Sequence, residues 1–401
     1  MVTDWRECAL GDVIELKRGY DLPKQERHPG SVPVVSSSGV TDHHSAAKVR
    51  GPGVVTGRYG TLGQVYYVEE DFWPLNTTLY VRDFKGNYPR FISYFLRGLD
   101  FLAYSDKAAV PGLNRNHLHK ASIRFPTNLS EQRAIAHILG TFDDKIELNR
   151  RINATLEAFT SALFVSWFVD FEPVRAKAEG RDPRVPKPIA DLLPPNFESS
   201  ELGKIPSGWI VRSLDEIARF MNGLVMQKYP PEGGRSLPVV KIAQLRSDNL
   251  NGADLASADI DSNYIVHDGD ILFSWSGSLE CVLWAGGEGA LNQHLFKVTS
   301  ATHPRWLSYL GIHLHLDGFR HIAAGKATTM GHIQRHHLSA AKLAVPSRDL
   351  LNAMGAVFEP LVESTWHRNV QSRTLAVMRE MLLPKLISGD LRIKDTERLI
   401  E

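Results

Sequence analysis

The stretch SEQRAIAHILGTFDDKIELNRRI, residues 130–152, decides how the rest of this chain is interpreted. Its apolar residues recur at helical spacing, it contains no proline, and it has no glycine after Gly140. It carries too much charge for a helix that is buried on all sides, so the pattern predicts a long amphipathic rod in the middle of the chain. A helix from about Ser130 to Phe168 would be roughly 50–60 Å long, at about 1.5 Å per residue.

The apolar residues of this rod follow alternating steps of three and four, which is the spacing of a coiled-coil seam. The seam consists of Ile135, Ile138, Phe142, Ile152, Leu156, Phe159 and Leu163, with the polar residues Lys145 and Asn149 between them. A second rod follows Pro346, and its seam consists of Phe358, Val362, Thr365, Asn369, Ser372, Ala376, Leu383 and Leu386. Each rod is therefore apolar near its ends and polar at its centre.

Length and composition indicate an ordinary globular protein. The chain has 401 residues, enough for two or three domains, with 43% hydrophobic and 23% charged residues. No segment approaches the roughly 20 apolar residues of a membrane span, and Asp4 and Glu7 do not fit a signal peptide. Cys8 and Cys281 have no metal-binding spacing, so we expect reduced thiols in a cytoplasmic protein. The net charge of +1 neither favours nor excludes a nucleic-acid partner.

Two similar stretches of sequence precede the two rods, which is the signature of an internal repeat. Trp5 is followed by a leucine, GDV and Gly19, and Trp209 is followed at identical spacing by a leucine, DEI and Gly223. Further matches occur in the same order: VPVV with LPVV, GVVTGRYGTLG with GDILFSWSGSLE, LNTTLYV with LNQHLFKV, FISYFL with WLSYLG, and LNRNHL with IQRHHL. The series predicts a tandem duplication; the alternative is two unrelated α/β domains with similar turns.

Each copy contains both β-type and helical patterns. Runs such as GVVTGRY, TLYVRDF, GDILFSW and HLFKVTS predict strands, and PRFISYFLRGLDFLA and PRWLSYLGIHLHLDGF predict helices. The fold class that we expect is therefore mixed α/β (α+β): two globular domains in tandem, with two long helices that form an antiparallel coiled coil. The proline-rich stretch 171–206 predicts an irregular connector.

A two-fold relation between the repeats would make the two rods antiparallel, with their polar centres together. Asn149 would then face Asn369. A buried asparagine pair costs stability but penalises shifted registers, because any slip leaves amides unpaired. The hypothesis is that Asn149 and Asn369 fix the inter-helix register; the alternative is that both face solvent.

Two similar domains at a fixed separation suit B-DNA, which repeats about every 34 Å. Residues 318–348 include several basic side chains and no acidic one. Lysine and arginine suit phosphates, whereas amide and guanidinium groups address base edges in the major groove. The candidate DNA-contacting residues are Arg58, Tyr59, Thr61, Asn76, Lys107, Asn114, Arg115 and Asn116 in the first copy, and Lys241, Gln244, Arg246, Ser276, Ser278, Gln293, Lys326, Thr328, Gln334 and Arg335 in the second. The alternative for any one of them is an ordinary solvated surface.

The whole chain resembles the specificity subunit of type I restriction–modification systems. The segments that carry the resemblance are IRFPTNLSEQRAIAHILGTFDDKIELNRRINATLEAFTSALFVSWFVDFEPVRAKAEG, LGKIPSGWIVRSLDEIARFMNG, the GDILFSWSGS and LNQHLFKV pair, and LLPKLISGDL. One departure is that the second rod has RDLLNAMGAV, residues 348–357, where the first has SEQRAIA. The two rods therefore differ in sequence at this part of the docking surface that the resemblance implies.

The resemblance implies a domain layout and a set of partners. The layout is a target-recognition domain at 1–125, a spacer helix at 126–170, a connector at 171–206, a second recognition domain at 207–345, a second spacer helix at 346–390 and a tail at 391–401. In this family each recognition domain reads one half of a bipartite double-stranded DNA site, and two modification (methyltransferase) subunits dock on the helices. Those partners bind S-adenosylmethionine, and separate restriction (motor and nuclease) subunits use ATP and Mg²⁺. We expect no cofactor on this chain.

The residues themselves indicate binding without catalysis. LLPPNF, residues 192–197, has the letters of a methyltransferase motif in the wrong order. Asp143 and Asp144 are adjacent on a helix and point about 100° apart, so we interpret them as solvated residues and not as a nuclease site. TDHHS and RHHL lack the spacing of helical metal ligands. The alternatives are a fused recognition and modification enzyme, and a structural coiled-coil adaptor that does not bind DNA.

Overall fold

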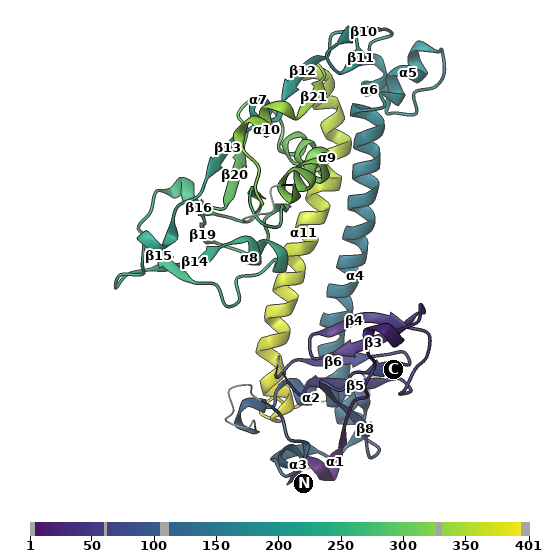
Figure 1. Cartoon of the computed structure of the whole chain (residues 1–401), viewed down its shortest axis with the longest axis vertical. Helices are drawn as coiled ribbons and strands as arrows, with labels where there is room; N and C mark the ends of the chain where they lie inside the picture. Colours follow the sequence, from purple (N-terminus) through teal and green to yellow (C-terminus); the bar gives the residue numbers. More distant parts are fainter. Residues whose placement is uncertain (1–4, 60–61, 105–111, 326–330, 394–401) are drawn as a thin grey trace. The chain divides into compact units, whose positions relative to one another are not determined.

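The structure is a computed structural model that describes residues 5–59, 62–104, 112–325 and 331–393 (Figure 1). The chain divides into two compact units: residues 1–145 with 375–401, and residues 146–374. We call these the first and the second unit. The two long helices, α4 (Leu129–Phe168) and α11 (Arg348–Ile387), each contribute one part to each unit.

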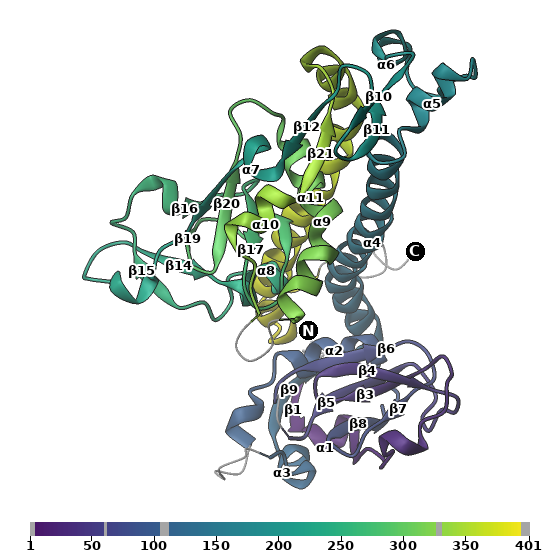
Figure 2. The ribbon, with the colours of Figure 1, turned by 45° about the horizontal axis from the view of Figure 1, so that its top comes forward.

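The first unit contains a mixed α/β globular region. Its elements are β1 (Trp5–Ala9), α1 (Leu10–Val13), β2 (Glu15–Arg18), β3 (Val32–Ser36), β4 (Gly39–His44), β5 (Gly53–Gly57), β6 (Val65–Val68), β7 (Trp73–Pro74), β8 (Thr78–Asp83), α2 (Pro89–Arg97), α3 (Arg115–His119) and β9 (Ser122–Pro126), with short 3₁₀ turns at Lys24–Glu26 and Phe101–Tyr104. The strands pair in the orders β2-β8-β5-β6, β4-β3-β7 and β1-β9. Helix α2 lies against the sheet that contains β5 and β6 (Figure 2).

The second unit repeats this plan with additions. Its elements are α5 (Glu172–Ala178), α6 (Lys187–Leu192), β10 (Phe197–Ser200), β11 (Gly203–Pro206), β12 (Ile210–Ser213), α7 (Leu214–Ile217), β13 (Arg219–Asn222), β14 (Ser236–Val240), α8 (Ile242–Ser247), β15 (Leu255–Ser257), β16 (Ile265–Val266), β17 (Ile271–Ser274), β18 (Cys281–Leu283), β19 (Gly289–Leu291), β20 (Leu295–Thr299), α9 (Arg305–Ala324), α10 (Arg335–Ala340) and β21 (Lys342–Val345). Short 3₁₀ turns lie at Met226–Lys228 and Ser262–Tyr264. The strand orders are β13-β20-β17-β18, β15-β14-β19-β16, β12-β21 and β10-β11.

The two strand plans confirm the internal repeat. The sheet β2-β8-β5-β6 corresponds to β13-β20-β17-β18, and the parallel pair β3 and β7 corresponds to β14 and β19. Gly19 and Gly223 occupy the same tight crossing: a Cβ would lie 2.1 Å from the carbonyl oxygen of Leu75 in one case and 2.3 Å from that of Asn292 in the other. Only glycine permits such an approach, which is why both copies have it.

Strand pairing corrects the sequence alignment by one residue. Thr56 pairs with Leu79 in the first unit, and Phe273 pairs with Phe296 in the second. The structural equivalent of Asn76 is therefore Gln293, whereas the letters LNTTL and LNQHL align Asn76 with Asn292. Hydrogen-bond register, and not residue identity, fixes the correspondence.

The stretch 171–206 is not the irregular connector that its prolines predict. It forms α5, α6 and the hairpin of β10 and β11. Val174, Ile189 and Ile205 are buried in the core of the second unit. Pro173 and Pro188 lie in the first turns of α5 and α6, where a missing N–H is tolerated, so these two prolines are compatible with the start of a helix.

The long helices are antiparallel within each unit, as predicted. In the second unit Asn149 contacts Gln371, whereas Phe164, further along α4, contacts Phe358, which lies earlier on α11. In the first unit Ile135 and Leu139 share a core with Leu386. The opposite order of the contacts gives the direction.

The seam on α4 differs from the prediction beyond Asn149. The buried residues there are Asn153, Thr160, Phe164, Trp167 and Phe168, whereas Phe159 is 55% exposed. A straight α-helix has 3.6 residues per turn, so a strict 3.5-residue pattern drifts off the contact face within a few turns. The seam on α11 is as predicted at its ends, where Phe358, Val362, Leu383 and Leu386 are buried.

Aromatic side chains attach the second globular region to its helix pair. The rings of Trp306 on α9 and Phe358 on α11 are stacked with centroids 4.9 Å apart, and Phe164 and Phe168 on α4 stack at 4.5 Å. Such pairs contribute about 0.5–1.5 kcal/mol each beyond the area that they bury.

Within the described residues, no single helix is long and apolar enough to cross a membrane; α4 and α5 together, bent by 43° at their junction, do meet the length and composition criteria. Cys8 and Cys281 are free, as predicted. Burial raises the pKa of the Cys281 thiol, which keeps it protonated.

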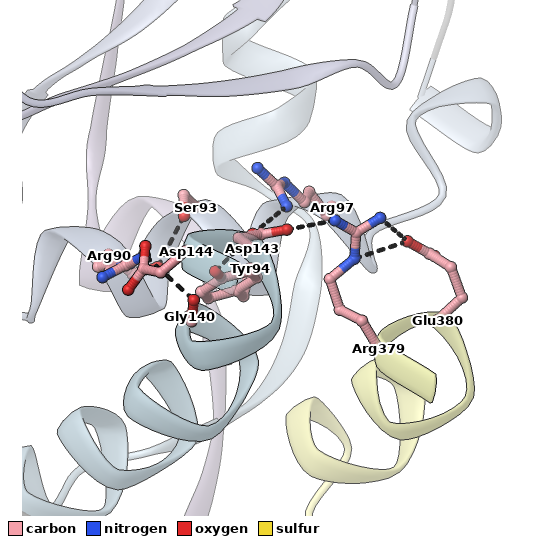
Figure 3. A network of polar contacts seen from close by, with 9 residues as sticks. All are labelled: Arg90, Ser93, Tyr94, Arg97, Gly140, Asp143, Asp144, Arg379 and Glu380. Carbon is pink, nitrogen blue, oxygen red and sulfur yellow. Dashed lines mark hydrogen bonds and ion pairs between the residues drawn. The ribbon is translucent and has the colours of Figure 1, made fainter. Parts of the chain in front are cut away.

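A polar network attaches α2 to both long helices in the first unit (Figure 3). The Tyr94 hydroxyl donates to Oδ2 of Asp143 at 2.6 Å, and Arg97 donates to the same oxygen at 3.1 Å. Arg379 of α11 pairs with the other carboxylate oxygen. Asp143 is therefore not the solvated residue that we expected. Asp144 alone is well exposed, and it pairs with Arg90.

The partners of Asp143 set its pKa. Burial raises the pKa, but the Tyr94 hydrogen bond and the charges of Arg97 and Arg379 outweigh burial, so the pKa lies below its ordinary value. A carboxylate whose pKa is depressed on folding stabilises the fold above the unfolded pKa, and that stabilisation is lost as the pH falls through the folded pKa.

We predict that Asp143→Asn lowers the free energy of unfolding by about 1–3 kcal/mol at pH 7, because charge-assisted hydrogen bonds are lost. Below about pH 4 the difference from the wild type shrinks, because the wild-type carboxylate becomes protonated. Urea unfolding at several pH values measures both effects. Asp144→Asn is the matched control, and an exposed pair contributes at most about 1 kcal/mol. Equal losses in the two variants would contradict the assignment.

Candidate nucleic-acid interface

Three segments meet in the first unit and contain several of the predicted residues. Arg58 N–H donates to the carbonyl of Thr77 at 2.9 Å, and Leu113 N–H donates to the carbonyl of Arg58 at 2.9 Å. Tyr59 forms an isolated β-bridge with Gly112. We call residues 58–59, 76–77 and 112–114 the first loop cluster. Segments far apart in the sequence are joined here because β5 ends and its antiparallel neighbour β8 begins at this point.

The second unit has the equivalent arrangement. Trp275 N–H donates to the carbonyl of His294 at 3.3 Å, and Ile333 N–H donates to the carbonyl of Trp275 at 2.9 Å. Ser276 forms an isolated β-bridge with His332. We call residues 275–276, 293–294 and 331–333 the second loop cluster. The same backbone bonds thus hold different side chains in the two copies.

The predicted residues of the first cluster are accessible. The Arg58 guanidinium lies 4.6 Å from the ring centroid of Tyr59, which is 42% exposed. The Asn76 amide nitrogen donates to Asp21. Asn114 caps α3 by accepting from the N–H of Asn116 at 2.9 Å. Asn114, Arg115 and Asn116 are all exposed.

Two predicted residues of the second copy are buried, so we no longer include them in the interface. Ser276 is 3% exposed, and its hydroxyl lies 2.9 Å from Nδ1 of His294. Gln244 is 8% exposed, and its Oε1 accepts from the N–H of Lys241 at the start of α8. The Ser276 contact joins residues 18 positions apart, whereas the Gln244 contact is a local one at the start of its own helix.

Arg335 is exposed, but its side chain is hydrogen-bonded to the edge strand of a sheet. Its guanidinium donates to the carbonyl of Phe220 on the edge strand β13 at 3.2 Å, and it lies 5.7 Å from the ring of Phe296. In the first unit Nε2 of His119 accepts from the N–H of Leu16 at the equivalent edge. Both contacts satisfy an edge strand that otherwise invites pairing with another chain, so we also remove Arg335 from the base-reading candidates.

Other predicted residues remain at the surface of the second unit. Lys241 pairs with Asp254. Arg246, Ser278 and Gln334 are exposed, and Gln293 is half-buried. Two basic side chains among the described residues of 318–348 form ion pairs: Arg320 with Asp317 and Glu280, and Lys342 with Glu201. The positive charge there is therefore weaker than the sequence count indicates. Thr61, Lys107, Lys326 and Thr328 lie outside the described residues.

Sequence reasoning missed Trp275 and His294 as members of the second cluster. The Trp275 indole donates to the carbonyl of Gln293 at 3.0 Å, and its ring centroid lies 5.8 Å from that of His294. A signal was present, because Trp275 aligns with the predicted residue Arg58 in the repeat. In the described part of the chain, no cluster of His, Cys, Asp and Glu suits a metal ion.

The asparagine pair in the helix seam is shifted by one turn from the prediction. Asn149 is 1% exposed and donates to Gln371 at 2.9 Å and to Ser372 at 3.1 Å. Asn369 instead accepts from Asn153 at 2.7 Å. Asn149 is thus not solvent-facing, but its direct partner is not Asn369. That these amides fix the register remains a prediction.

Residues 3–158 match the family model described as type I restriction modification DNA specificity domain. This part of the chain is therefore similar to the DNA specificity domains of type I restriction–modification systems.

Individual relatives extend the likeness along the chain. The type I restriction enzyme HindI specificity subunit of Haemophilus influenzae is 22% identical over 97% of this chain and 100% of its own length. The type I restriction enzyme MjaIX specificity subunit of Methanocaldococcus jannaschii is 26% identical over 73% of this chain and 65% of its own length. The crystal structure of the type I restriction–modification system S subunit from M. genitalium has the same fold, with a TM-score of 0.55 at 16% identity, over 95% of this chain and 96% of that one. The resemblance predicted from the motifs is confirmed.

We predict that Asn153→Leu destabilises the second unit by about 1–3 kcal/mol, because Asn369 loses its buried donor. The double variant Asn153→Leu with Asn369→Leu recovers part of this loss, because a leucine pair leaves no unpaired amide. Urea unfolding of the two single variants and the double variant gives the coupling energy. Additive effects would show that the two amides do not act as a pair.

Proposed function

We propose that this chain is the DNA sequence-specificity subunit of a type I restriction–modification complex. Each recognition domain reads one half of a bipartite, asymmetric DNA target in the major groove. The observation that carries the proposal is the pair of loop clusters: one backbone framework is used twice, with different side chains at equivalent positions. Two unlike copies on one chain suit an asymmetric site, since a symmetric reader needs identical copies.

The side chains of the clusters support DNA as the ligand. Arg58 and Tyr59 form a cationic and aromatic pair at the first cluster. In the second unit, Lys241 and Arg246 follow β14 in the sequence. The end of β14 is hydrogen-bonded to Asn292, and Asn292 lies next to the second cluster. Guanidinium and ammonium groups suit phosphates, and the amides of Asn76 and Gln293 suit base edges. A coiled-coil adaptor that does not bind DNA would not require these cationic and amide side chains on its loops.

The chain itself is not catalytic in this proposal, and the homologous proteins are named specificity subunits. Methyl transfer belongs to two modification subunits that bind S-adenosylmethionine, and cleavage belongs to restriction subunits that use ATP and Mg²⁺. We place the recognition domains at 1–125 and 207–345 and the spacer helices at 126–170 and 346–390. The expected location of the complex is the cytoplasm.

The spacer helices provide a surface for the modification subunits. Leu148 and Phe159 are 48% and 55% exposed on α4, and they lie eleven residues apart, close to three helical turns. Both therefore lie on one face, away from the buried Asn149 and Asn153. Apolar side chains exposed on one helix face are typical of a protein-binding surface.

The first test uses the purified chain alone with duplex DNA. A gel shift should show binding that weakens steeply as the salt concentration rises, because phosphate contacts release counterions. Addition of radiolabelled S-adenosylmethionine should give no methyl transfer until modification subunits are present. Transfer by the chain alone would favour the fused enzyme, and the absence of any salt-dependent shift would favour the adaptor.

The second test changes the length of the helices. Insertion of one heptad into α4 with a matching heptad in α11 adds about 10 Å, so the gap between the two half-sites should grow by about three base pairs of 3.4 Å. Sequencing of methylated DNA from cells that contain the modification subunits measures the gap. A seven-residue insertion after Gly180, in an exposed loop of the second unit, is the control. An unchanged gap in the helix variant would contradict the proposed spacing role.

A further inference from the structure

The second loop cluster holds the backbone of Gln293 firmly. The Trp275 indole nitrogen donates to the Gln293 carbonyl at 3.0 Å, and the Trp275 backbone N–H donates to the next carbonyl, that of His294, at 3.3 Å. The His294 N–H in turn donates to Oδ1 of Asn292 at 3.2 Å. The segment 292–294 is therefore tied to the end of β17, and its position does not depend on a ligand.

The side chain of Gln293 is held as well. Its Nε2 lies 3.3 Å from Nε2 of His294, and Nδ1 of the same imidazole lies 2.9 Å from the hydroxyl of Ser276, which is buried. Because an amide nitrogen only donates, Nε2 of His294 accepts and the neutral ring carries its proton on Nδ1. That proton is then donated to Ser276. A chain of hydrogen bonds thus fixes which way the amide of Gln293 faces.

This arrangement leaves one donor and one acceptor of the amide for a ligand. Nε2 has a second N–H, and within the described residues no partner is recorded for Oε1. The first copy does the same with different residues: the Asn76 amide, at the equivalent position, has its nitrogen held by Asp21. Two unrelated internal acceptors orient an amide at the same place in both copies.

A side-chain amide that offers one N–H and one carbonyl oxygen matches the major-groove edge of adenine, which presents N7 as an acceptor and N6–H as a donor. Guanine presents two acceptors there, so its O6 would face the amide oxygen. We infer that Gln293 is a specificity-determining residue that reads an adenine in the half-site bound by the second recognition domain. The inference rests on the proposed function and adds the identity of one base to it.

The experiment selects bound sequences from a randomised duplex library with the full-length chain. The wild type should enrich a bipartite motif with an adenine at one position of the second half. Gln293→Leu should lower the preference for that adenine by about tenfold or more, while the other positions of both halves keep theirs. Gln293→Glu keeps the shape of the side chain but removes the N–H that donates to N7, so this variant should also lose the adenine preference. It keeps the test decisive if the leucine variant folds poorly.

Three comparisons make the result specific. Gln227→Leu changes an exposed glutamine of the same unit and should leave the motif unaltered. Asn76→Leu should leave the second half unaltered. Ser276→Ala removes the anchor of His294 and should weaken the same adenine preference, although Ser276 itself is buried.

The outcomes separate the two proposals. If the wild type enriches no bipartite motif, the proposed function fails and this inference fails with it. If the motif is present and both Gln293 variants keep the adenine, or lose every position of that half equally, the inference alone is wrong. Loss of a single preference for a base other than adenine also overturns it.

Discussion

The antiparallel contact between α4 and α11 is the interaction on which the rest of each unit depends. In the second unit Phe358 packs against both Phe164 of α4 and Trp306 of α9, so the helix pair is also the base of the globular core. In the first unit Asp143 of α4 binds Tyr94 of the globular region and Arg379 of α11. Both globular regions are thus attached to the helices by side chains that also join the helices to each other.

The polar centre of the helix pair affects stability differently from its apolar ends. Asn149 and Asn153 are buried, and each has an amide oxygen without a hydrogen-bond partner among the residues that the structure describes. Such groups lower stability, because desolvation is not fully compensated. Packing of Phe164 and Phe358 stabilises the helix pair, whereas we expect the amides to favour one register over shifted ones. One register of the two helices is what the proposed spacing role of α4 and α11 requires.

The two loop clusters show how one backbone framework accommodates two sets of side chains. Backbone bonds between strand ends are the same in both copies, so the framework does not depend on the loop side chains. Arg58 is replaced by Trp275, Tyr59 by Ser276 and Asn76 by Gln293 at equivalent positions. The shared backbone bonds therefore allow different side chains at these positions.

The sequence by itself determined the duplication, the mixed α/β class and the two long antiparallel helices, because glycine positions, β-type runs and helical periodicity are local signals. It also pointed to the loops that form both clusters. Only the tertiary structure decided which side chains face outward: Ser276 turns toward His294, Arg335 closes the edge at Phe220, and Phe159 leaves the helix seam. The physical reason is that these orientations depend on partners far away in the sequence, and local spacing carries no information about them.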